Sequence, residues 1–234
     1  MTRRYFNSLT IAVSLTLAVL AGTVYAAEKE FRFEGAVKAY EQASAENPPT
    51  AEHTFFVGSS TFTGWKNIPN DFAEFNAVNR GFGGSTFTDW NDIATARLLA
   101  PYKPARIVLY CGTNDLSGGV APDVVLERFK TFLDDVRKLN PDVKIHFCAV
   151  HDAPVREKVW DANKAYNEAV KKMAEEDPNL YYVDFNAAVR DDEGKVREEL
   201  YRADRLHFTR EAEQLLVPFI VESIRKEIAD SEKN

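Results

Sequence analysis

Short apolar runs alternate with longer amphipathic segments over about 180 residues of this chain. Five of the runs are rich in β-branched and aromatic residues, which is typical of buried strands. Strands separated by helices pair in parallel through helical crossovers. The pattern therefore predicts a three-layer α/β/α sandwich around a five-stranded parallel sheet, with strands at 54–57, 75–79, 107–111, 143–150 and 180–184.

The segments between these runs carry apolar residues at helical spacing. The first, residues 31–45, precedes the first strand and is expected to lie against the domain. We therefore divide the chain into an N-terminal helix and connector, residues 27–53, and an α/β domain, residues 54–230. Further helices are expected at 90–99, 124–139, 159–174 and 210–228, the last with a kink at Pro218.

The first 26 residues have the three parts of a secretory signal peptide. Arg3 and Arg4 precede an apolar run over 9–21, and a cleavage site follows at Ala26. A retained membrane anchor would need roughly 20 apolar residues, and this run is shorter. We expect a periplasmic or secreted protein with no stable membrane anchor after cleavage. The paired arginines also resemble a twin-arginine signal, so both export routes stay open.

Charge and composition restrict the partners of the exported protein. Loss of Arg3 and Arg4 with the signal changes the formal net charge from −7 to −9. An acidic chain without a cluster of lysine and arginine argues against nucleic acid or an anionic membrane as partner. The sequence has no Cys/His spacing for zinc, and the glycines at 81–84 fit neither a dinucleotide nor a phosphate loop. We expect no cofactor and no metal.

Two cysteines, Cys111 and Cys148, remain in a chain expected to enter an oxidising compartment. Both lie in strand-like apolar runs. A disulfide between them would need a suitable Cα separation. Two buried free thiols are the favoured interpretation.

A glycine and two serines follow the first expected strand. Gly58 ends the apolar run, and Ser59 and Ser60 precede a short amphipathic segment that ends near Trp65. A serine at this turn lies at the carboxyl edge of the sheet, where open α/β folds bind their ligands. The unpaired amides of the following helix can stabilise an anion there. The alternative is that the two serines only cap a helix.

Nucleophilic attack by a serine needs a base, and histidine has a suitable pKa. His53 precedes the first strand and His146 lies within the fourth, so both are interpreted as structural. His151 lies at the sheet edge and is a pocket candidate. His207 follows Asp204 by three residues, a spacing at which the carboxylate can orient the imidazole. The alternative for that pair is an ordinary surface contact.

A tetrahedral intermediate also needs hydrogen-bond donors for its oxyanion. The Gly84 amide, in the glycine-rich loop at 79–85, and the Asn114 side chain, in the loop at 112–115, suit this role. The alternatives are a turn that needs positive φ for the glycine and a turn-forming side-chain bond for the asparagine.

Together, four loops resemble the characteristic blocks of the SGNH hydrolases, also called GDSL-like esterases and lipases. The blocks lie in the family's order at 58–60, 79–85, 112–115 and 204–207. Ser59 stands where the family usually has aspartate, a residue outside the triad. The resemblance implies a flavodoxin-like fold, with Ser60 as nucleophile, His207 as base and Asp204 as its orienter.

The same resemblance implies an oxyanion hole formed by the Ser60 amide, the Gly84 amide and the Asn114 side chain. The loop at 151–156 lies where relatives vary, so His151 and Arg156 are expected to shape the substrate pocket.

The resulting hypothesis is a metal-independent serine esterase that acts outside the cytoplasm. Family analogy and export favour a small acyl ester as its substrate, with O-acetyl groups on carbohydrate preferred. A lysophospholipase or thioesterase of the same family is the first alternative, although the polar candidate loops do not suggest a long apolar channel. A non-catalytic glycan-binding domain that has kept the fold is the second.

Overall fold

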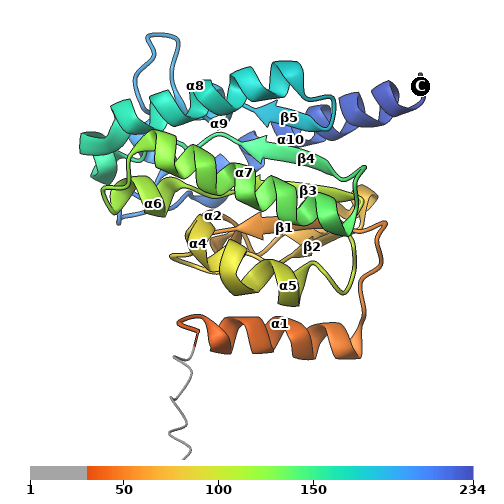
Figure 1. Ribbon diagram of the computed structural model, residues 1–234. Helices are drawn as coiled ribbons and strands as arrows, with labels where there is room; N and C mark the ends of the chain where they lie inside the picture. Colours follow the sequence, from red (N-terminus) through yellow and green to blue (C-terminus); the bar gives the residue numbers. More distant parts are fainter. Residues whose placement is uncertain (1–30, 234) are drawn as a thin grey trace, which may run out of the picture. The chain divides into compact units, whose positions relative to one another are not determined.

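Five parallel strands form one sheet in the order β2-β1-β3-β4-β5 (Figure 1). The computed structural model describes residues 31–233, so the expected signal peptide lies outside the described residues. The order is that of doubly wound folds whose ligands bind at the switch point between β1 and β3, where the strand order reverses. The prediction of a three-layer sandwich with five parallel strands is confirmed. The strands are β1 (Thr54–Gly58), β2 (Ala77–Asn79), β3 (Arg106–Tyr110), β4 (Lys144–Cys148) and β5 (Leu180–Val183).

Helices precede, connect and follow the strands. The α-helices are α1 (Glu34–Glu46), α2 (Ser60–Gly64), α3 (Ile68–Asp71), α4 (Phe87–Asp89), α5 (Thr95–Leu98), α6 (Thr113–Ser117), α7 (Pro122–Leu139), α8 (Trp160–Glu176), α9 (Phe185–Val189) and α10 (Arg210–Ser231). Short 3-10 helices occupy Ala73–Phe75, Pro154–Val159 and Glu198–Leu200.

The sheet buries both faces, as the apolar strands require. Phe55 and Val57 of β1 point into one core with side chains of α1, α5, α7 and α8. Phe56, between them, points into the other core with side chains of α2, α9 and α10. Figure 1 shows α7 and α8 in front of the sheet and α10 behind it. The alternation of side chains along β1 therefore produces the three layers.

The helix expected at 90–99 begins earlier than predicted and is irregular. Thr86 and Asp89 form a capping box, in which the Thr86 amide donates to Asp89 Oδ2 over 2.8 Å. The segment Trp90–Ala94 is then π-helical before α5. The prediction followed the apolar spacing and missed the cap, which is a polar signal.

The N-terminal helix α1 packs on the glycine-rich loop. Tyr40 Oη donates to the Gly81 carbonyl over 2.5 Å, and Arg80 donates to Ser44 Oγ over 2.6 Å. Phe33, at the start of the helix, lies 4.9 Å from Phe82 between ring centres. The helix therefore supports the loop that follows β2.

Both cysteines, Cys111 and Cys148, are buried and form no disulfide, which confirms the free-thiol interpretation. Burial raises the pKa of each thiol. His146 is also buried, inside β4, and its Nδ1 lies 2.8 Å from Ser223 Oγ. Burial lowers the pKa of His146 to about 3, so this histidine is neutral at physiological pH. The three side chains belong to the core.

Candidate active site

The turn after β1 is fixed by a close approach of two strands. Gly58 has φ +135°, and a Cβ built on it would lie 1.9 Å from the carbonyl oxygen of Tyr110 in β3. The Ser59 amide then donates to that same carbonyl over 3.0 Å. Only glycine fits at this close approach, because any side chain would overlap the backbone of β3. The tight turn sets the start of α2.

The two serines of the turn differ in exposure and in contacts. Ser59 is fully buried, and its hydroxyl makes no hydrogen bond with any residue in 31–233. It precedes α2 without a side-chain capping bond, so the capping alternative is wrong for its hydroxyl. Ser60 is partly exposed at the first position of α2. Of the two hydroxyls, that of Ser60 is the one a substrate can reach.

The glycine-rich loop lies beside Ser60. The Phe82 amide donates to the Gly58 carbonyl over 3.0 Å, and a Cβ on Gly83 would lie 3.8 Å from Ser60 Cβ. Gly84 has φ +82° and is exposed. Within residues 31–233, neither the Ser60 N–H nor the Gly84 N–H donates a hydrogen bond. Two amide donors therefore remain available near the serine.

A third donor comes from the turn after β3. Asn114 lies in α6, and its Nδ2 donates to the Ser85 carbonyl over 3.0 Å. Its Oδ1 accepts from Arg156 over 3.0 Å. A carboxamide nitrogen carries two hydrogens. The second N–H of Asn114 has no partner among the described residues, and so it too is available to an oxyanion.

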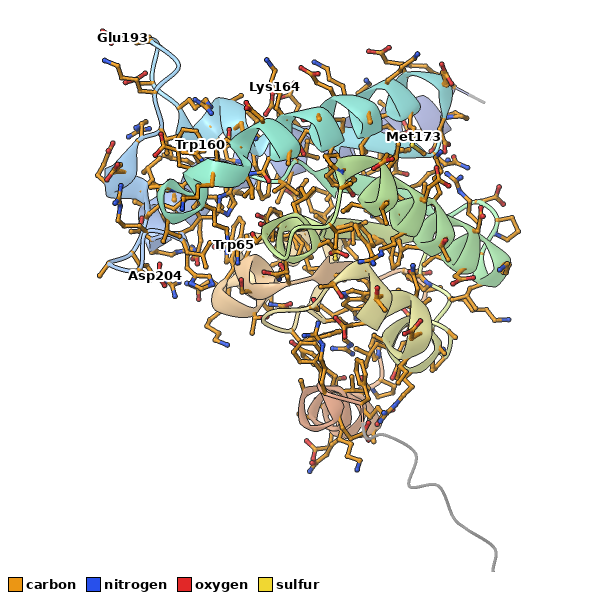
Figure 2. The ribbon with its side chains drawn as sticks, turned by 60° about the vertical axis from the view of Figure 1, so that its left-hand side comes forward. Trp65, Trp160, Lys164, Met173, Glu193 and Asp204 are labelled. Carbon is orange, nitrogen blue, oxygen red and sulfur yellow. The ribbon has the colours of Figure 1, made fainter. Side chains whose placement is uncertain are left out.

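His207 and Asp204 form a tight local pair. His207 Nδ1 lies 2.7 Å from Asp204 Oδ2, and the amides of His207 and Leu206 both donate to Asp204 Oδ1 over 2.9 Å. These bonds, led by the His207 amide, hold the pKa of Asp204 well below its usual range. Figure 2 shows Asp204 on a loop at the margin of the domain. The carboxylate is thus ionised and bound to the imidazole.

The loop that carries this pair lies against two neighbouring parts of the site. A Cβ on Gly64, in α2, would lie 3.7 Å from the Arg202 guanidinium. The Val155 amide donates to the Arg205 carbonyl over 3.1 Å. No hydrogen bond joins Ser60 Oγ to His207, but the loop at 202–207 contacts the segments that follow β1 and β4. Catalytic hydrogen bonds are often long before substrate binds and shorten in the complex.

His151 and Arg156, the two expected pocket residues, are less exposed than Asp204. His151 is 3% exposed and packs against Phe208, with ring centres 4.1 Å apart. Burial lowers the pKa of His151 to about 3, with smaller contributions from the charges of Arg156 and His207. Arg156 is half-buried and donates to Thr113 Oγ1 over 2.9 Å, besides its bond to Asn114.

Sequence reasoning did not single out Ser85, Thr113 or Asp115, although all three lie within the quoted blocks. Asp115 is 1% exposed and accepts from the Phe87 amide over 3.2 Å and from Arg128 over 2.7 Å. Ser85 Oγ donates to the Gly58 carbonyl over 3.0 Å. These residues join the loops after β1, β2 and β3. Their position inside the motifs was the only available signal.

The candidate residues do not line the groove beside the edge strand β5. That groove, of about 940 Å³, follows the edge strand β5 and includes Lys144, Lys171 and Tyr181. It contains no candidate catalytic side chain. Residues 31–233 also contain no group of three or more His, Cys, Asp or Glu side chains that could hold a metal ion. The chemistry of the strand ends, not cavity size, locates the site.

A parallel sheet with a serine turn, unpaired amides and an Asp–His pair is the arrangement expected of a carboxylic ester hydrolase with a three-layer α/β fold. The model of the GDSL-like lipase/acylhydrolase family matches residues 52–215. The chain belongs to this family, which confirms the resemblance to SGNH hydrolases. No curated protein matches the chain in sequence.

Solved structures share the fold at low sequence identity. A GDSL-like lipase from Bacteroides thetaiotaomicron is 21% identical with a TM-score of 0.68, covering 81% of this chain and 97% of that one. A carbohydrate esterase of family 3 from Talaromyces cellulolyticus is 15% identical with a TM-score of 0.61, covering 76% and 99%. An acetyl-xylooligosaccharide esterase from Geobacillus is 17% identical with a TM-score of 0.60, covering 75% and 94%.

The close approach of Gly58 to β3 predicts that one added methyl group strongly lowers the stability of the fold. Gly58→Ala is expected to cost more than about 4 kcal/mol of unfolding free energy, because the new Cβ overlaps the Tyr110 carbonyl. Gly119→Ala is the matched control, with φ +84° and no atom within 4 Å of the new Cβ. Strain alone should cost about 1–2 kcal/mol there. Urea unfolding measures both, and equal losses would contradict this reading of the turn.

Proposed function

We propose that this protein is an exported serine esterase that removes small acyl groups, with O-acetyl groups on carbohydrate as the preferred substrates. Ser60 is the nucleophile, His207 the base and Asp204 its orienter. The observation that carries the proposal is the set of unpaired donors beside Ser60, on the same sheet edge as the bonded pair at 2.7 Å. A serine with a base and preorganised donors suits acyl transfer.

In the proposed reaction, Ser60 Oγ attacks the ester carbonyl while His207 Nε2 takes the hydroxyl proton. The amides of Ser60 and Gly84 and the Asn114 Nδ2 stabilise the resulting oxyanion. His207 then gives the proton to the leaving alcohol, and a water molecule repeats the sequence to release the acid. Asp204 stays ionised throughout and stabilises the imidazolium.

The exposure of the pair favours a large, hydrophilic substrate. The side chains of Asp204 and His207 are 49% and 29% exposed, so the base lies open to solvent. A sugar polymer can present an acetyl group to such a surface, whereas a long acyl chain needs an apolar channel to leave water. Two of the similar structures are named as a carbohydrate esterase and an acetyl-xylooligosaccharide esterase, which supports the same substrate class.

Hydrolysis of p-nitrophenyl esters tests this proposal. We expect kcat/KM for the acetate to exceed that for the octanoate by at least about tenfold, because the polar candidate loops do not favour burial of the longer chain. Ser60→Ala should lower kcat/KM for the acetate by at least about a thousandfold. Ser231→Ala, at the exposed end of α10, is the control and should match the wild type.

Two results would redirect the assignment. A preference for octanoate would favour the lysophospholipase or thioesterase alternative. Binding of acetylated polysaccharide without release of acetate would favour a glycan-binding domain.

Export is part of the same proposal. The basic start, the apolar run over 9–21 and the small residues before Ala26 support cleavage there. Within residues 31–233, no helix has the length and apolarity needed to cross a membrane. The intact mass of the protein recovered outside the cytoplasm should be that of a chain without residues 1–26. A full-length protein retained inside the cell would contradict export.

A further inference from the structure

The orientation of the Asn114 side chain is decided by two partners of opposite character. The Ser85 carbonyl can only accept a hydrogen bond, and Asn114 Nδ2 donates to it over 3.0 Å. The Arg156 guanidinium can only donate, and it donates to Asn114 Oδ1 over 3.0 Å. If the carboxamide turned over by 180°, an N–H would face the guanidinium and an oxygen would face the carbonyl. Both contacts would then be repulsive.

Arg156 is itself held in place. Its Nη1 donates to Thr113 Oγ1 over 2.9 Å and to the Thr113 carbonyl over 3.3 Å, while Nη2 reaches Asn114. The planar fork of a guanidinium can serve two neighbouring residues at once, which an ammonium group cannot do. Arg156 is half-buried, and no ion pair joins it to a carboxylate among the described residues. The hydrogen bonds of its guanidinium among residues 31–233 therefore all go to Thr113 and Asn114, in the turn after β3.

The consequence concerns the free N–H of Asn114. With Nδ2 fixed toward Ser85, its second hydrogen has no partner among residues 31–233 and can join the amides of Ser60 and Gly84 in binding an oxyanion. A charged donor at Oδ1 also polarises the carboxamide and strengthens the bond that its N–H can give. Without Arg156, the turned-over carboxamide would present an oxygen lone pair to a developing oxyanion.

We infer that Arg156 is a positioning residue that fixes the carboxamide of Asn114 with its N–H toward the oxyanion, and that it does not bind substrate directly. The inference rests on the proposed function, since it assigns Asn114 to the oxyanion hole. It also replaces the sequence-based expectation that Arg156 contributes to the substrate pocket. The residue acts through Asn114, so its effect should exist only while Asn114 is present.

A double-mutant cycle with p-nitrophenyl acetate tests this dependence. Asn114→Ala should lower kcat by about a hundredfold to a thousandfold, as removal of one oxyanion donor does. Arg156→Ala should lower kcat by about tenfold to a hundredfold and change KM by less than about threefold, because the ground state gains little from the donor. In the Asn114→Ala background, Arg156→Ala should change kcat by less than about twofold.

Two further variants distinguish the proposed role of Arg156 from a general effect of its loss on folding. Arg156→Lys keeps the charge but offers one point donor, and it should recover part of the lost kcat. Arg190→Ala removes another partly buried arginine, which pairs with Asp152 and does not touch Asn114. It should keep the wild-type kcat. A loss from Arg156→Ala that persists in full without Asn114, or one that appears in KM, would overturn the inference in favour of direct substrate contact.

A spectroscopic readout separates this inference from the proposed function. In a nitrogen-15 NMR spectrum, the Asn114 side-chain amide should shift in Arg156→Ala and stay unchanged in Arg190→Ala. This measurement needs no ester. An unshifted Asn114 signal overturns the role of Arg156 even if the enzyme is active. If Arg156→Ala shifts the signal but the wild-type protein hydrolyses no ester, the Arg156–Asn114 contact is supported and only the proposed function is overturned.

Discussion

The close approach of β1 to its parallel neighbour β3 sets the geometry on which the site depends. At Gly58 the two backbones approach so closely that the space holds a hydrogen atom and no methyl group. This approach ends the strand, buries Ser59 and starts α2 at Ser60, whose amide donates no hydrogen bond among residues 31–233. The glycine-rich loop then hydrogen-bonds to the Gly58 carbonyl. One steric constraint therefore places the candidate nucleophile and two of the candidate oxyanion donors.

Around Gly58, each polar side chain of the candidate site is oriented by partners that match its donors and acceptors. Asp204 accepts from the amides of Leu206 and His207 and lies 2.7 Å from the imidazole, so its carboxylate orients His207. Arg156 and the Ser85 carbonyl hold the two ends of the Asn114 carboxamide. Each arrangement leaves one group, His207 Nε2 or the second N–H of Asn114, without a hydrogen bond among residues 31–233. Such preorganisation lets a site stabilise charge without reorganising during the reaction.

Much of this could be predicted from sequence because the relevant signals are local. The five strands follow from apolar runs, and the Asp204–His207 pair follows from a spacing of three residues. The capping box at Thr86 and Asp89 was also a local signal, but the prediction relied on apolar spacing and started the helix at residue 90. The parallel sheet then brings the strand ends together without any further information.

The remaining features depend on contacts between distant segments, which the spacing of residues does not encode. His151 stands at the end of β4, as a pocket residue should, yet Phe208 covers its ring. Arg156 lies 42 residues from Asn114 and forms its bond only when the loops after β3 and β4 meet. No local pattern distinguishes an arginine that binds substrate from one that orients a neighbouring side chain.

The activation of Ser60 is most directly tested by labelling the mature protein with a fluorophosphonate probe and mapping the modified peptide. Such probes react with a serine only where a base and an oxyanion hole activate it. The label should be found on Ser60, should persist in Ser59→Ala and should vanish in Ser60→Ala. Label on Ser59, or no label on the folded wild-type protein, would contradict the assignment of Ser60 as the nucleophile.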